Sequence, residues 1–302
     1  MKKRIIAIVM TMFMFIMAGC SQNKEREITD REGTQVSIPN KIDKIISTAP
    51  SNTEVIVDLG LGDKLVAVDK YSSDVPGISK DLTKIDFSNP DAEAIIGLNP
   101  DIIIASGHNK TGSSEDPFKL VKEAGIPVVY IPSSESIKGI YEDIEFIANI
   151  LNVENKGNEL VNDMKSKIDE IASIGKNITD KKSVYFEISP APSLFTFGQG
   201  TFLNEMIEII GAKNIFADEK GWISPSAESV IDKNPDIIFT NVDYTENPIK
   251  EIETRDGFEN ISAVKNNAVY QIDKNSSSRP SQNIILALSQ MAESIYPDKY
   301  EK

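Results

Sequence analysis

The sequence predicts an α/β protein with two related lobes, each built on a parallel sheet, joined by one long α-helix. A repeated window predicts the lobes: residues 87–103 read FSNPDAEAIIGLNPDII and residues 222–238 read WISPSAESVIDKNPDII. These windows share nine identities at an offset of 135 residues, which indicates two large repeats rather than a short-period solenoid. Strand and helix patterns alternate on either side of a long amphipathic segment, which supplies the joining helix.

The first lobe begins with a small hairpin over residues 28–38. Strand patterns follow at residues 44–48, 64–68, 101–105 and 126–131. The intervening segments have helix signals, with Pro50 and polar capping residues at the start of one helix and Gly125 at the end of another. Strand, helix and strand in steps of this size predict parallel βαβ units with both sheet faces covered.

The joining helix is expected over residues 154–174. Leu160, Met164, Ile168 and Ile171 recur there at helical spacing, after a shorter amphipathic helix over residues 136–151. About 21 residues at 1.5 Å each make a helix roughly 30 Å long, which is a stiff spacer when packed. We therefore expect an N-terminal lobe over residues 28–152, the connecting helix over 153–175 and a C-terminal lobe over 176–302.

The second lobe repeats the pattern of the first. Strands are expected at residues 182–188, 236–240 and 267–272, with helices at 202–209 and 283–295 and a polar loop over 275–280. The spacing from Thr53-Glu54 to Gly60 equals the spacing from Asn204-Glu205 to Gly211, which extends the internal symmetry beyond the repeated windows.

The first 19 residues have the pattern of a signal peptide. Lys2, Lys3 and Arg4 precede an uncharged apolar run over residues 5–17, and small residues then lead to Cys20. This end resembles a bacterial lipobox, which would make Cys20 the lipidated first residue of the mature chain and residues 20–27 a tether. An ordinary signal peptide is the alternative. Cys20 is the only cysteine, so no disulfide is expected.

The charge balance argues against nucleic acid as a partner. The chain has 32 Lys and Arg against 46 Asp and Glu, a net charge of −14. Removal of Lys2, Lys3 and Arg4 leaves 29 basic residues against 46 acidic ones, or −17. So acidic a surface also disfavours electrostatic docking on anionic lipid, and the lipid on Cys20 would be the membrane contact.

The residue inventory favours binding over catalysis. His108 is the one histidine, so the usual transition-metal site is disfavoured and no metal is expected. A Ser-His-Asp triad would need His108 as its base, yet no GxSxG elbow is present, and neither a Walker loop nor GxGxxG occurs. We expect no enzyme activity and no resident cofactor.

Ligands of open α/β sheets lie outside the carboxyl ends of the strands. Two such lobes would hold a ligand in the cleft between them. The residues that we expect to contact the ligand follow predicted strands in the two lobes: Ser51, Asn52, Tyr71, Phe87, Ser106, Phe195, Phe197, Trp222, Asp243 and Arg279. His108 lies in the same set of loops as either a solvated residue or a cleft residue.

Glu93 and Glu228 occupy identical places in the two repeated windows. A glutamate in the first turn of a helix is favoured by the helix dipole at about 0.3–1 kcal/mol, which explains either residue alone. Identical glutamates in two otherwise diverged lobes suggest a second role, such as binding to two arginine-lined sockets on a pseudo-symmetric partner.

These residues resemble a known family, the substrate-binding lipoproteins of bacterial ABC importers for cobalamin, ferric siderophores or haem, which are binding proteins of the long-helix class. The resemblance covers nearly all of the mature chain. It rests on ITDREGTQVSIP from Ile28, STAPSNTE from Ser47, both ExxIxxNPD windows, LFTFGQG from Leu194, NIF from Asn214 and SRPS from Ser278.

The resemblance implies two Rossmann-like lobes joined by a rigid helix, limited closure on the ligand, and a monomer that docks on a dimeric permease with a cytoplasmic ATPase. The docking glutamates of the family fall on Glu93 and Glu228. A lipid anchor on Cys20 would hold the protein at the outer face of the cytoplasmic membrane.

Within the family the cobalamin binders look closest. Their ligand-facing aromatics fall on Tyr71, Phe87, Phe195 and Trp222, and their cleft arginine on Arg279. Ser106 stands where an aromatic is expected, and Phe87 replaces a larger indole, so the aromatic cage is thinner. A ferric siderophore or haem therefore stays open as the transported ligand, and Arg279 could meet an anionic chelate. A non-transport lipoprotein, either a surface hydrolase or an adhesion module, is the remaining alternative.

Overall fold

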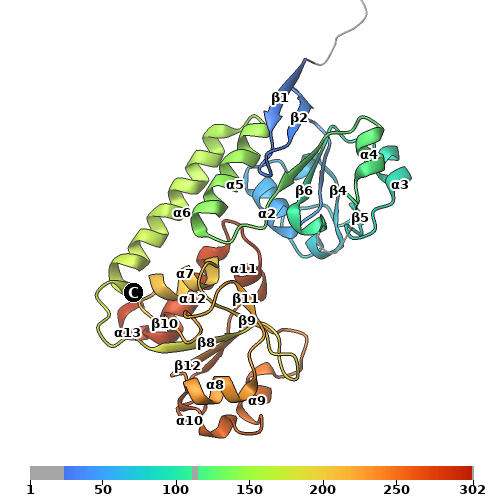
Figure 1. The fold of residues 1–302 in the computed structure, drawn as a ribbon. Helices are drawn as coiled ribbons and strands as arrows, with labels where there is room; N and C mark the ends of the chain where they lie inside the picture. The colour runs from blue at the N-terminus through green and yellow to red at the C-terminus, as the bar shows by residue number, and fades with distance from the viewer. Residues whose placement is uncertain (1–23, 111–114, 301–302) are drawn as a thin grey trace, which may run out of the picture.

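The computed structural model describes residues 24–110 and 115–300, which form two α/β lobes joined by the long helix α6 (Glu154–Gly175) (Figure 1). An antiparallel hairpin of β1 (Glu25–Thr29) and β2 (Gln35–Pro39) stands at the outer end of the N-terminal lobe. β1 begins inside the segment expected as a tether. Within the described ranges, no helix is long and apolar enough to cross a membrane.

The N-terminal lobe has five parallel strands in the order β5-β4-β3-β6-β7. The strands are β3 (Ile45–Ser47), β4 (Leu65–Asp69), β5 (Thr83–Ile85), β6 (Ile102–Ser106) and β7 (Val128–Ile131). The helices are α2 (Pro50–Asp58), α3 (Ala92–Gly97), α4 (Lys119–Glu123) and α5 (Ile137–Ile150). Alternate residues of β6 enter two cores, Ile102 and Ile104 on the side of α2 and α5, and Ile103 and Ala105 on the side of α3 and α4.

The C-terminal lobe repeats this topology with one strand fewer. Its four parallel strands have the order β10-β8-β12-β13, which corresponds to β4-β3-β6-β7 of the first lobe. The strands are β8 (Ser183–Glu187), β10 (Lys213–Asn214), β12 (Ile237–Thr240) and β13 (Val269–Gln271). The matching order confirms the prediction of an α/β protein with two related lobes and parallel sheets.

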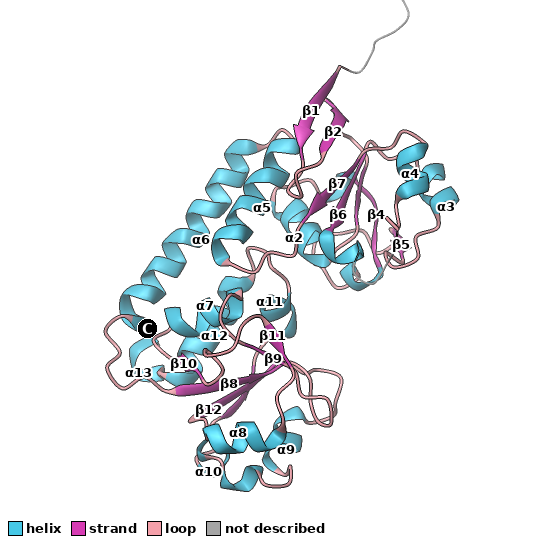
Figure 2. Cartoon of the chain, viewed as in Figure 1, coloured by secondary structure: helices cyan, strands magenta, loops and turns pink. Residues whose placement is uncertain are grey.

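Helices lie on both sides of this second sheet (Figure 2). They are α7 (Phe202–Ile209), α8 (Ala227–Lys233), α9 (Pro248–Glu253), α10 (Ser262–Lys265), α11 (Lys274–Ser278), α12 (Ile284–Ile295) and α13 (Pro297–Tyr300). A two-stranded antiparallel ribbon of β9 (Thr196–Phe197) and β11 (Trp222–Ile223) lies at the end of the lobe nearer to the N-terminal lobe (Figure 1).

The repeated NPD sequence has the same structural role in both lobes. Asn99 and Asn234 end their helices in the left-handed region, with φ of 50° and 42°, where asparagine is one of the few residues accepted without much strain. The Oδ2 atom of Asp101 accepts the backbone N–H groups of Asp43 and Lys44 at 2.7 and 2.9 Å. Asp236 accepts the backbone N–H and hydroxyl of Ser183, both at 2.8 Å. Each aspartate thus ties its strand to the amino end of the neighbouring strand.

Residues 275–280, expected as a polar loop, mostly belong to helix α11. Its sequence KNSSS has low helix propensity. The helix forms because Asp273 caps it, accepting the N–H of Ser276 at 2.8 Å, and because Ser276 and Ser277 are buried. Tertiary packing therefore overrides the local composition.

Helix α6 packs on both lobes through close backbone contacts at its two ends. Gly157 lies against Ala148 of α5, and Gly175 lies against the Ile209 carbonyl at the end of α7. The Tyr300 hydroxyl of α13 donates to the Ile171 carbonyl of α6 at 3.4 Å. The connecting helix is therefore held at both ends, which keeps it a stiff spacer.

Replacement of Gly175 by alanine tests this attachment. A Cβ at Gly175 would overlap backbone atoms of Ile209 and Gly211. We expect Gly175→Ala to lower the free energy of unfolding by about 1–3 kcal/mol in urea denaturation. Gly97→Ala is the matched control, because Gly97 is also helical and its Cβ would meet nothing within 4 Å. Equal stability of the two variants would contradict the close contact.

Candidate functional site

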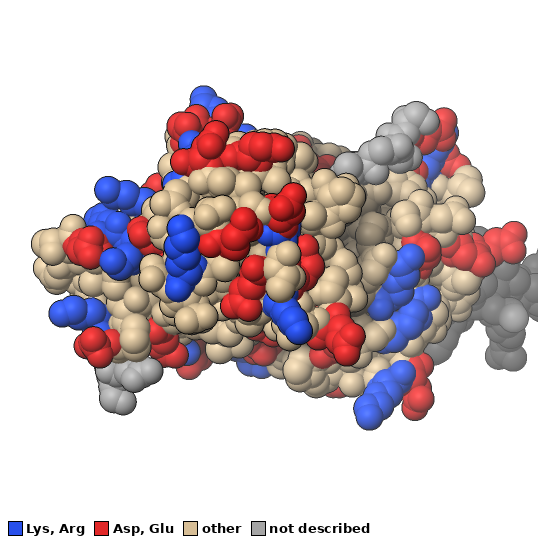
Figure 3. Space-filling model, turned by 90° about the horizontal axis from the view of Figure 1, so that it is seen from below, with Lys and Arg blue, Asp and Glu red and all other residues tan. Residues whose placement is uncertain are grey.

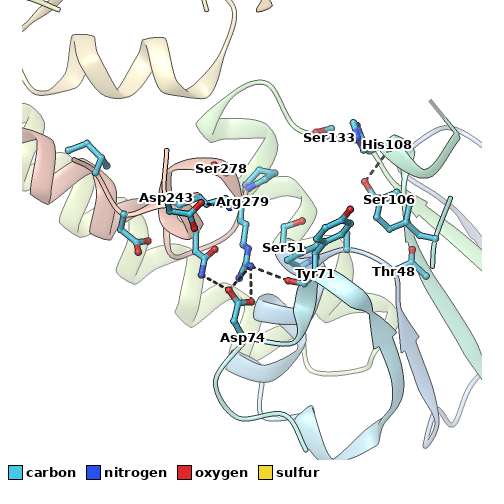
Figure 4. Close-up of a pocket in the computed structure, with 18 of the residues that line it drawn as sticks. Thr48, Ser51, Tyr71, Asp74, Ser106, His108, Ser133, Asp243, Ser278 and Arg279 are labelled. Atoms are coloured by element: carbon cyan, nitrogen blue, oxygen red, sulfur yellow. Dashed lines mark hydrogen bonds and ion pairs between the residues drawn. The ribbon is translucent and has the colours of Figure 1, made fainter. Parts of the chain in front are cut away.

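A cleft of about 980 Å³ opens between the lobes (Figure 4). Its lining combines polar and charged side chains with two aromatic rings. The lining residues are Thr48, Ala49, Pro50, Ser51, Tyr71, Asp74, Phe87, Ser106, His108, Asn109, Ser133, Asp243, Gln271, Ile272, Asp273, Lys274, Asn275, Ser278, Arg279, Pro280 and Gln290. The cleft lies at the carboxyl ends of the strands in both sheets, as expected for open α/β sheets.

The N-terminal wall is held by the buried side chain of Asn109. Its Oδ1 accepts the Thr48 hydroxyl at 2.6 Å and the Ser106 N–H at 2.8 Å. Its amide donates to the Thr48 carbonyl at 3.3 Å. The loops after β3 and β6 are therefore joined to each other, which presents Ser51 and Ser106 to the cleft on a fixed frame.

Two aromatic rings form an apolar part of this wall. Tyr71 and Phe87 have ring centroids 5.9 Å apart, and the Tyr71 side chain is 58% exposed. Asp69, buried at the end of β4, accepts the Tyr71 N–H at 2.8 Å and so positions the turn. Burial raises the pKa of Asp69 above its ordinary value despite its hydrogen bonds with Ser72 and Tyr71. An exposed aromatic pair of this kind offers a face to a flat apolar ligand.

The C-terminal wall is formed mainly by α11 and the segments on either side of it, with Asp243 from the loop after β12. Lys274 donates to Asp243 at 2.7 Å, and both side chains of this pair are about half exposed. The Asn241 side chain donates to the Ser278 hydroxyl at 3.1 Å, which fixes the position of that serine. Helix α11 thus carries a cation and several neutral polar groups to the edge of the cleft.

Arg279 crosses from the C-terminal lobe to the N-terminal lobe. It donates to both carboxylate oxygens of Asp74 at 2.8 and 3.0 Å and to the Tyr71 carbonyl at 3.2 Å (Figure 4). It also donates to Glu54 at 2.8 Å. Burial would lower the pKa of Arg279, but its hydrogen bonds to Glu54 and Asp74 raise that pKa above its ordinary value. The guanidinium is therefore permanently charged and already paired with two carboxylates.

Glu54, in α2, is the buried centre of this contact between the lobes. It is 4% exposed and accepts, besides Arg279, the Ser281 hydroxyl at 2.5 Å and the Asn283 amide at 3.0 Å. Buried carboxylates require such partners, because an unpaired buried charge is costly. We call Glu54, Asp74, Arg279, Ser281 and Asn283 the interlobe clasp.

A carboxylate of the C-terminal lobe crosses in the direction opposite to Glu54 and Asp74. Glu205 of α7 accepts the N–H of Ile137, at the start of α5, at 2.8 Å. Burial raises the pKa of Glu205, although the hydrogen bond from Ile137 acts against it. Glu54 and Glu205 occupy matching positions in the two halves of the sequence, so internal symmetry supplies one crossing carboxylate from each lobe.

The structure places the sequence-predicted residues in three groups. Ser51, Tyr71, Phe87, Ser106, Asp243 and Arg279 line the cleft together, as does His108. Asn52 is buried beneath it, at 3% exposure. Phe195, Phe197 and Trp222 form a separate aromatic cluster on the C-terminal lobe.

In this cluster Phe195 stacks on Trp222, with centroids 6.1 Å apart and an interplanar angle of 9°. Phe197 meets the edge of Trp222 from the interior and is fully buried, whereas Trp222 is 42% exposed. Phe197 therefore supports the exposed indole from behind.

Sequence reasoning missed most of the other residues of the cleft and its clasp, among them Glu54, Asp74, Lys274, Asn275 and Ser278. The equal spacing of Glu54 and Glu205 to their helix-ending glycines was a signal for Glu54, since it marked both as part of the internal symmetry. The other four lie outside the repeated windows, and their contacts join residues that are far apart in the chain.

Two lobes on a stiff helix, with a large polar and aromatic cleft between them, define a bilobed solute-binding protein. A model of the periplasmic binding protein family matches residues 45–276, so the chain belongs to this family and is a substrate-binding protein of an ABC transporter. Substrate-binding proteins of ABC importers work with a permease and an ATPase.

Comparisons with known proteins agree with this membership. The uncharacterized ABC transporter substrate-binding lipoprotein YvrC of Bacillus subtilis is 37% identical over 280 residues, which cover 91% of this chain and 87% of YvrC. A vitamin B12-binding protein of Vibrio campbellii is 27% identical, over 83% of this chain and 88% of its own.

A solved structure from Staphylococcus epidermidis has the same fold. It is described as a possible iron-binding (periplasmic solute-binding) protein and is 34% identical. The TM-score is 0.76, with 85% of this chain and all of the other covered.

Removal of the Glu54 charge tests the interlobe clasp. Glu54→Gln keeps the shape of the side chain but leaves Arg279 with Asp74 as its one charged partner. We expect the free energy of unfolding to fall by about 1.5–3 kcal/mol, the usual contribution of a hydrogen bond to a charged group. Glu246→Gln removes an exposed carboxylate and should be neutral in the same denaturation experiment. An unchanged free energy of unfolding in Glu54→Gln would contradict the role of the interlobe clasp.

Proposed function

We propose that the protein captures cobalamin or a related corrinoid in the interlobe cleft outside the cytoplasm and delivers it to the permease of an ABC importer. The observation that carries this proposal is the chemistry of the cleft, which combines the Tyr71–Phe87 ring pair with many hydroxyl and amide side chains. The name of the Vibrio campbellii relative, a vitamin B12-binding protein, supports the same ligand class.

A corrinoid fits this lining in chemistry and in size. Its flat macrocycle presents an apolar face for which aromatic rings are suitable partners, and its rim carries neutral amides that exchange hydrogen bonds with hydroxyl and amide groups. The cleft of about 980 Å³ lies at the upper end of the range of roughly 300–1,000 Å³ for small-molecule sites. Such a volume suits a large chelate better than an amino acid or a simple sugar.

We place the Phe195–Trp222 stack on the opposite wall of the ligand site. It belongs to the ribbon of β9 and β11, at the end of the C-terminal lobe that is nearer to the N-terminal lobe (Figure 1). A small closure of the lobes on the ligand would bring the exposed indole to the edge of the bound macrocycle.

A ferric siderophore is the second candidate ligand, with haem as a variant of it. The Staphylococcus epidermidis structure described as possibly iron-binding is the more similar in sequence of the two ligand-associated relatives, at 34% against 27% identity. Ser106 also leaves the aromatic cage thinner on the N-terminal wall. A compact ferric chelate would need fewer aromatic contacts than a corrinoid.

Glu93 and Glu228 are proposed as the contacts to the permease. The NPD residues of the repeated windows have structural roles in both lobes, whereas Glu93 and Glu228 are exposed on the first turns of α3 and α8. Hydrogen bonds with its own backbone N–H and with Ser226 hold the pKa of Glu228 below its ordinary value. Exposed carboxylates on both lobes suit a pair of arginine sockets on a dimeric permease.

The surroundings of α8 are compatible with such a contact. Seen from below, acidic and basic side chains are interspersed among uncharged residues, without one extended basic area (Figure 3). A contact on this surface would therefore depend on individual carboxylates rather than on a broad field of one sign.

Lipidation of Cys20 and anchorage at the outer face of the cytoplasmic membrane complete the proposal. Cys20 and the expected signal peptide lie outside the described residues, so they rest on the lipobox pattern alone. The name of YvrC as a lipoprotein supports an anchor of the same kind.

Ligand capture is tested by titration of the domain without residues 1–20. Trp222 is the only tryptophan, so saturable quenching of its emission by cobalamin would report binding near the indole. Calorimetry must accompany the quenching, because corrinoids absorb strongly. We expect Tyr71→Ala to weaken binding roughly three- to tenfold, the contribution of one aromatic contact.

Tyr244→Ala is the matched control for that variant. Tyr244 is also exposed, at 66%, but it does not line the cleft. Equal effects of Tyr71→Ala and Tyr244→Ala would argue against the cleft as the ligand site. Binding of ferric chelates with no binding of corrinoids would favour the second candidate.

Permease docking is tested with the double variant Glu93→Ala and Glu228→Ala. We expect it to abolish ligand uptake by cells while leaving the ligand dissociation constant of the isolated domain within about twofold. Each single variant should retain part of the uptake, because one lobe still docks. A large loss of affinity in the double variant would show that the glutamates serve the ligand site instead.

A further inference from the structure

We infer that the cleft selects metal chelates that carry no net negative charge. This inference rests on the proposed function, since it defines the charge class of the ligand that the cleft would capture. It argues against the alternative, left open by the sequence, in which Arg279 meets an anionic chelate.

The charges on the cleft lining carry the argument. The described residues that line the cleft include two cations, Arg279 and Lys274, and three carboxylates, Asp74, Asp243 and Asp273. Glu54 adds a fourth carboxylate directly behind Arg279. With His108 counted as neutral at pH 7, the cleft has an excess of two negative charges before any ligand enters.

Arg279 is committed to the interlobe clasp. Its side chain is 12% exposed, and one amino group contacts Glu54 while the other contacts both oxygens of Asp74. Figure 4 shows the guanidinium directed to Asp74, away from Ser106, Ser133 and His108. An anion could reach this cation only by displacing a carboxylate that would then remain in the cleft, so the repulsion would persist.

Lys274 is also paired with a carboxylate, but this ion pair is weaker than those of Arg279. It pairs with Asp243 at 2.7 Å in an exposed position, where the pair can open. Its release would leave Asp243 uncompensated at the rim, and Asp273 lies next to Lys274 in the chain. Neither cation thus provides a site for a carboxylate or phenolate of the ligand.

Neutral donors, in contrast, are free to meet the ligand. The side-chain hydroxyls of Ser51 and Ser133 have no hydrogen-bond partner within the described part of the chain, and both residues line the cleft. The Ser106 and Ser278 hydroxyls accept hydrogen bonds from His108 N–H and Asn241, which leaves their own protons available. Four serine hydroxyls suit carbonyl and amide oxygens on the rim of a neutral chelate.

The charges of the cleft divide the candidate ligands into those that it accepts and those that it rejects. Cobalamin, whose rim side chains are amides and whose nucleotide phosphate is balanced by the positive cobalt–corrin centre, satisfies the cleft, as do cobinamide and neutral or cationic ferric hydroxamates. Haem, with two propionates, and triply anionic ferric catecholates do not. Ligand charge, rather than the identity of the metal, is the property that the lining discriminates.

The experiment first compares corrinoids that differ in charge but hardly in shape and then extends the comparison to ferric chelates of different structure. Cobalamin and its monocarboxylic and tricarboxylic derivatives, made by hydrolysis of rim amides, are titrated by calorimetry at pH 7.5 and low salt. Ferrioxamine B, which is cationic, and ferric enterobactin, with three negative charges, form a second series. We expect each added negative charge to weaken binding roughly tenfold, and added salt to reduce the difference.

Two variants test the residues independently. Asp74→Asn removes one partner of Arg279, and Asp243→Asn removes the partner of Lys274. Each variant should therefore reduce the difference in dissociation constant between amide and carboxylate ligands by roughly tenfold. Asp180→Asn, which removes an exposed carboxylate paired with Lys182 away from the cleft, should leave that difference unchanged. Thermal unfolding of each variant confirms that it is folded.

The outcomes separate this inference from the proposed function. Binding of the carboxylate derivatives or of ferric enterobactin as tightly as their neutral or cationic counterparts would overturn the charge selection and leave chelate capture intact. The charge selection would also be overturned if the difference in affinity between amide and carboxylate ligands stayed unchanged in both Asp74→Asn and Asp243→Asn. Failure of every chelate to bind would overturn the proposed function and this inference together.

Discussion

The position of the two lobes depends on a buried carboxylate that is satisfied from the other side of the molecule. Glu54 lies in α2 of the N-terminal lobe, but its hydrogen-bond donors Arg279, Ser281 and Asn283 all belong to the C-terminal lobe. Separation of the lobes at this point would break the ion pair of Glu54 with Arg279 and both of its other hydrogen bonds at once. The stiffness of α6 sets the distance between the lobes, and the clasp sets their orientation. The width of the cleft follows from both.

Most of the fold was predictable because its signals are local or repeated. The NPD residues read as a helix end followed by a strand in both windows, and the structure explains each of them: Asn99 takes the left-handed conformation and Asp101 ties two strands together. The amphipathic spacing of residues 154–174 likewise predicted α6, since helix periodicity over 21 residues leaves little ambiguity. Because the window occurs in both halves of the sequence, the structure predicted for one copy could be checked against the structure predicted for the other.

The rest depends on pairings that no local pattern records. Arg279 contacts Asp74 and Glu54, which lie 205 and 225 residues earlier, so its commitment to the clasp could not be inferred from its neighbours in the sequence. Phe197 read like the other aromatics of its segment, yet it is buried behind Trp222. The KNSSS segment became a helix only because Asp273 and the surrounding packing stabilise it. In each case tertiary contacts decide between alternatives that composition leaves open.

Glu54 and Glu205 together restrain the opening of the cleft. Glu54 reaches from the first lobe to the second, and Glu205 reaches from the second to the start of α5. A pull that separates the lobes therefore strains both contacts at once, since α6 stops one lobe from sliding past the other. The two contacts restrain the same opening motion from opposite lobes, so the cleft opens fully only when the contacts of both glutamates yield.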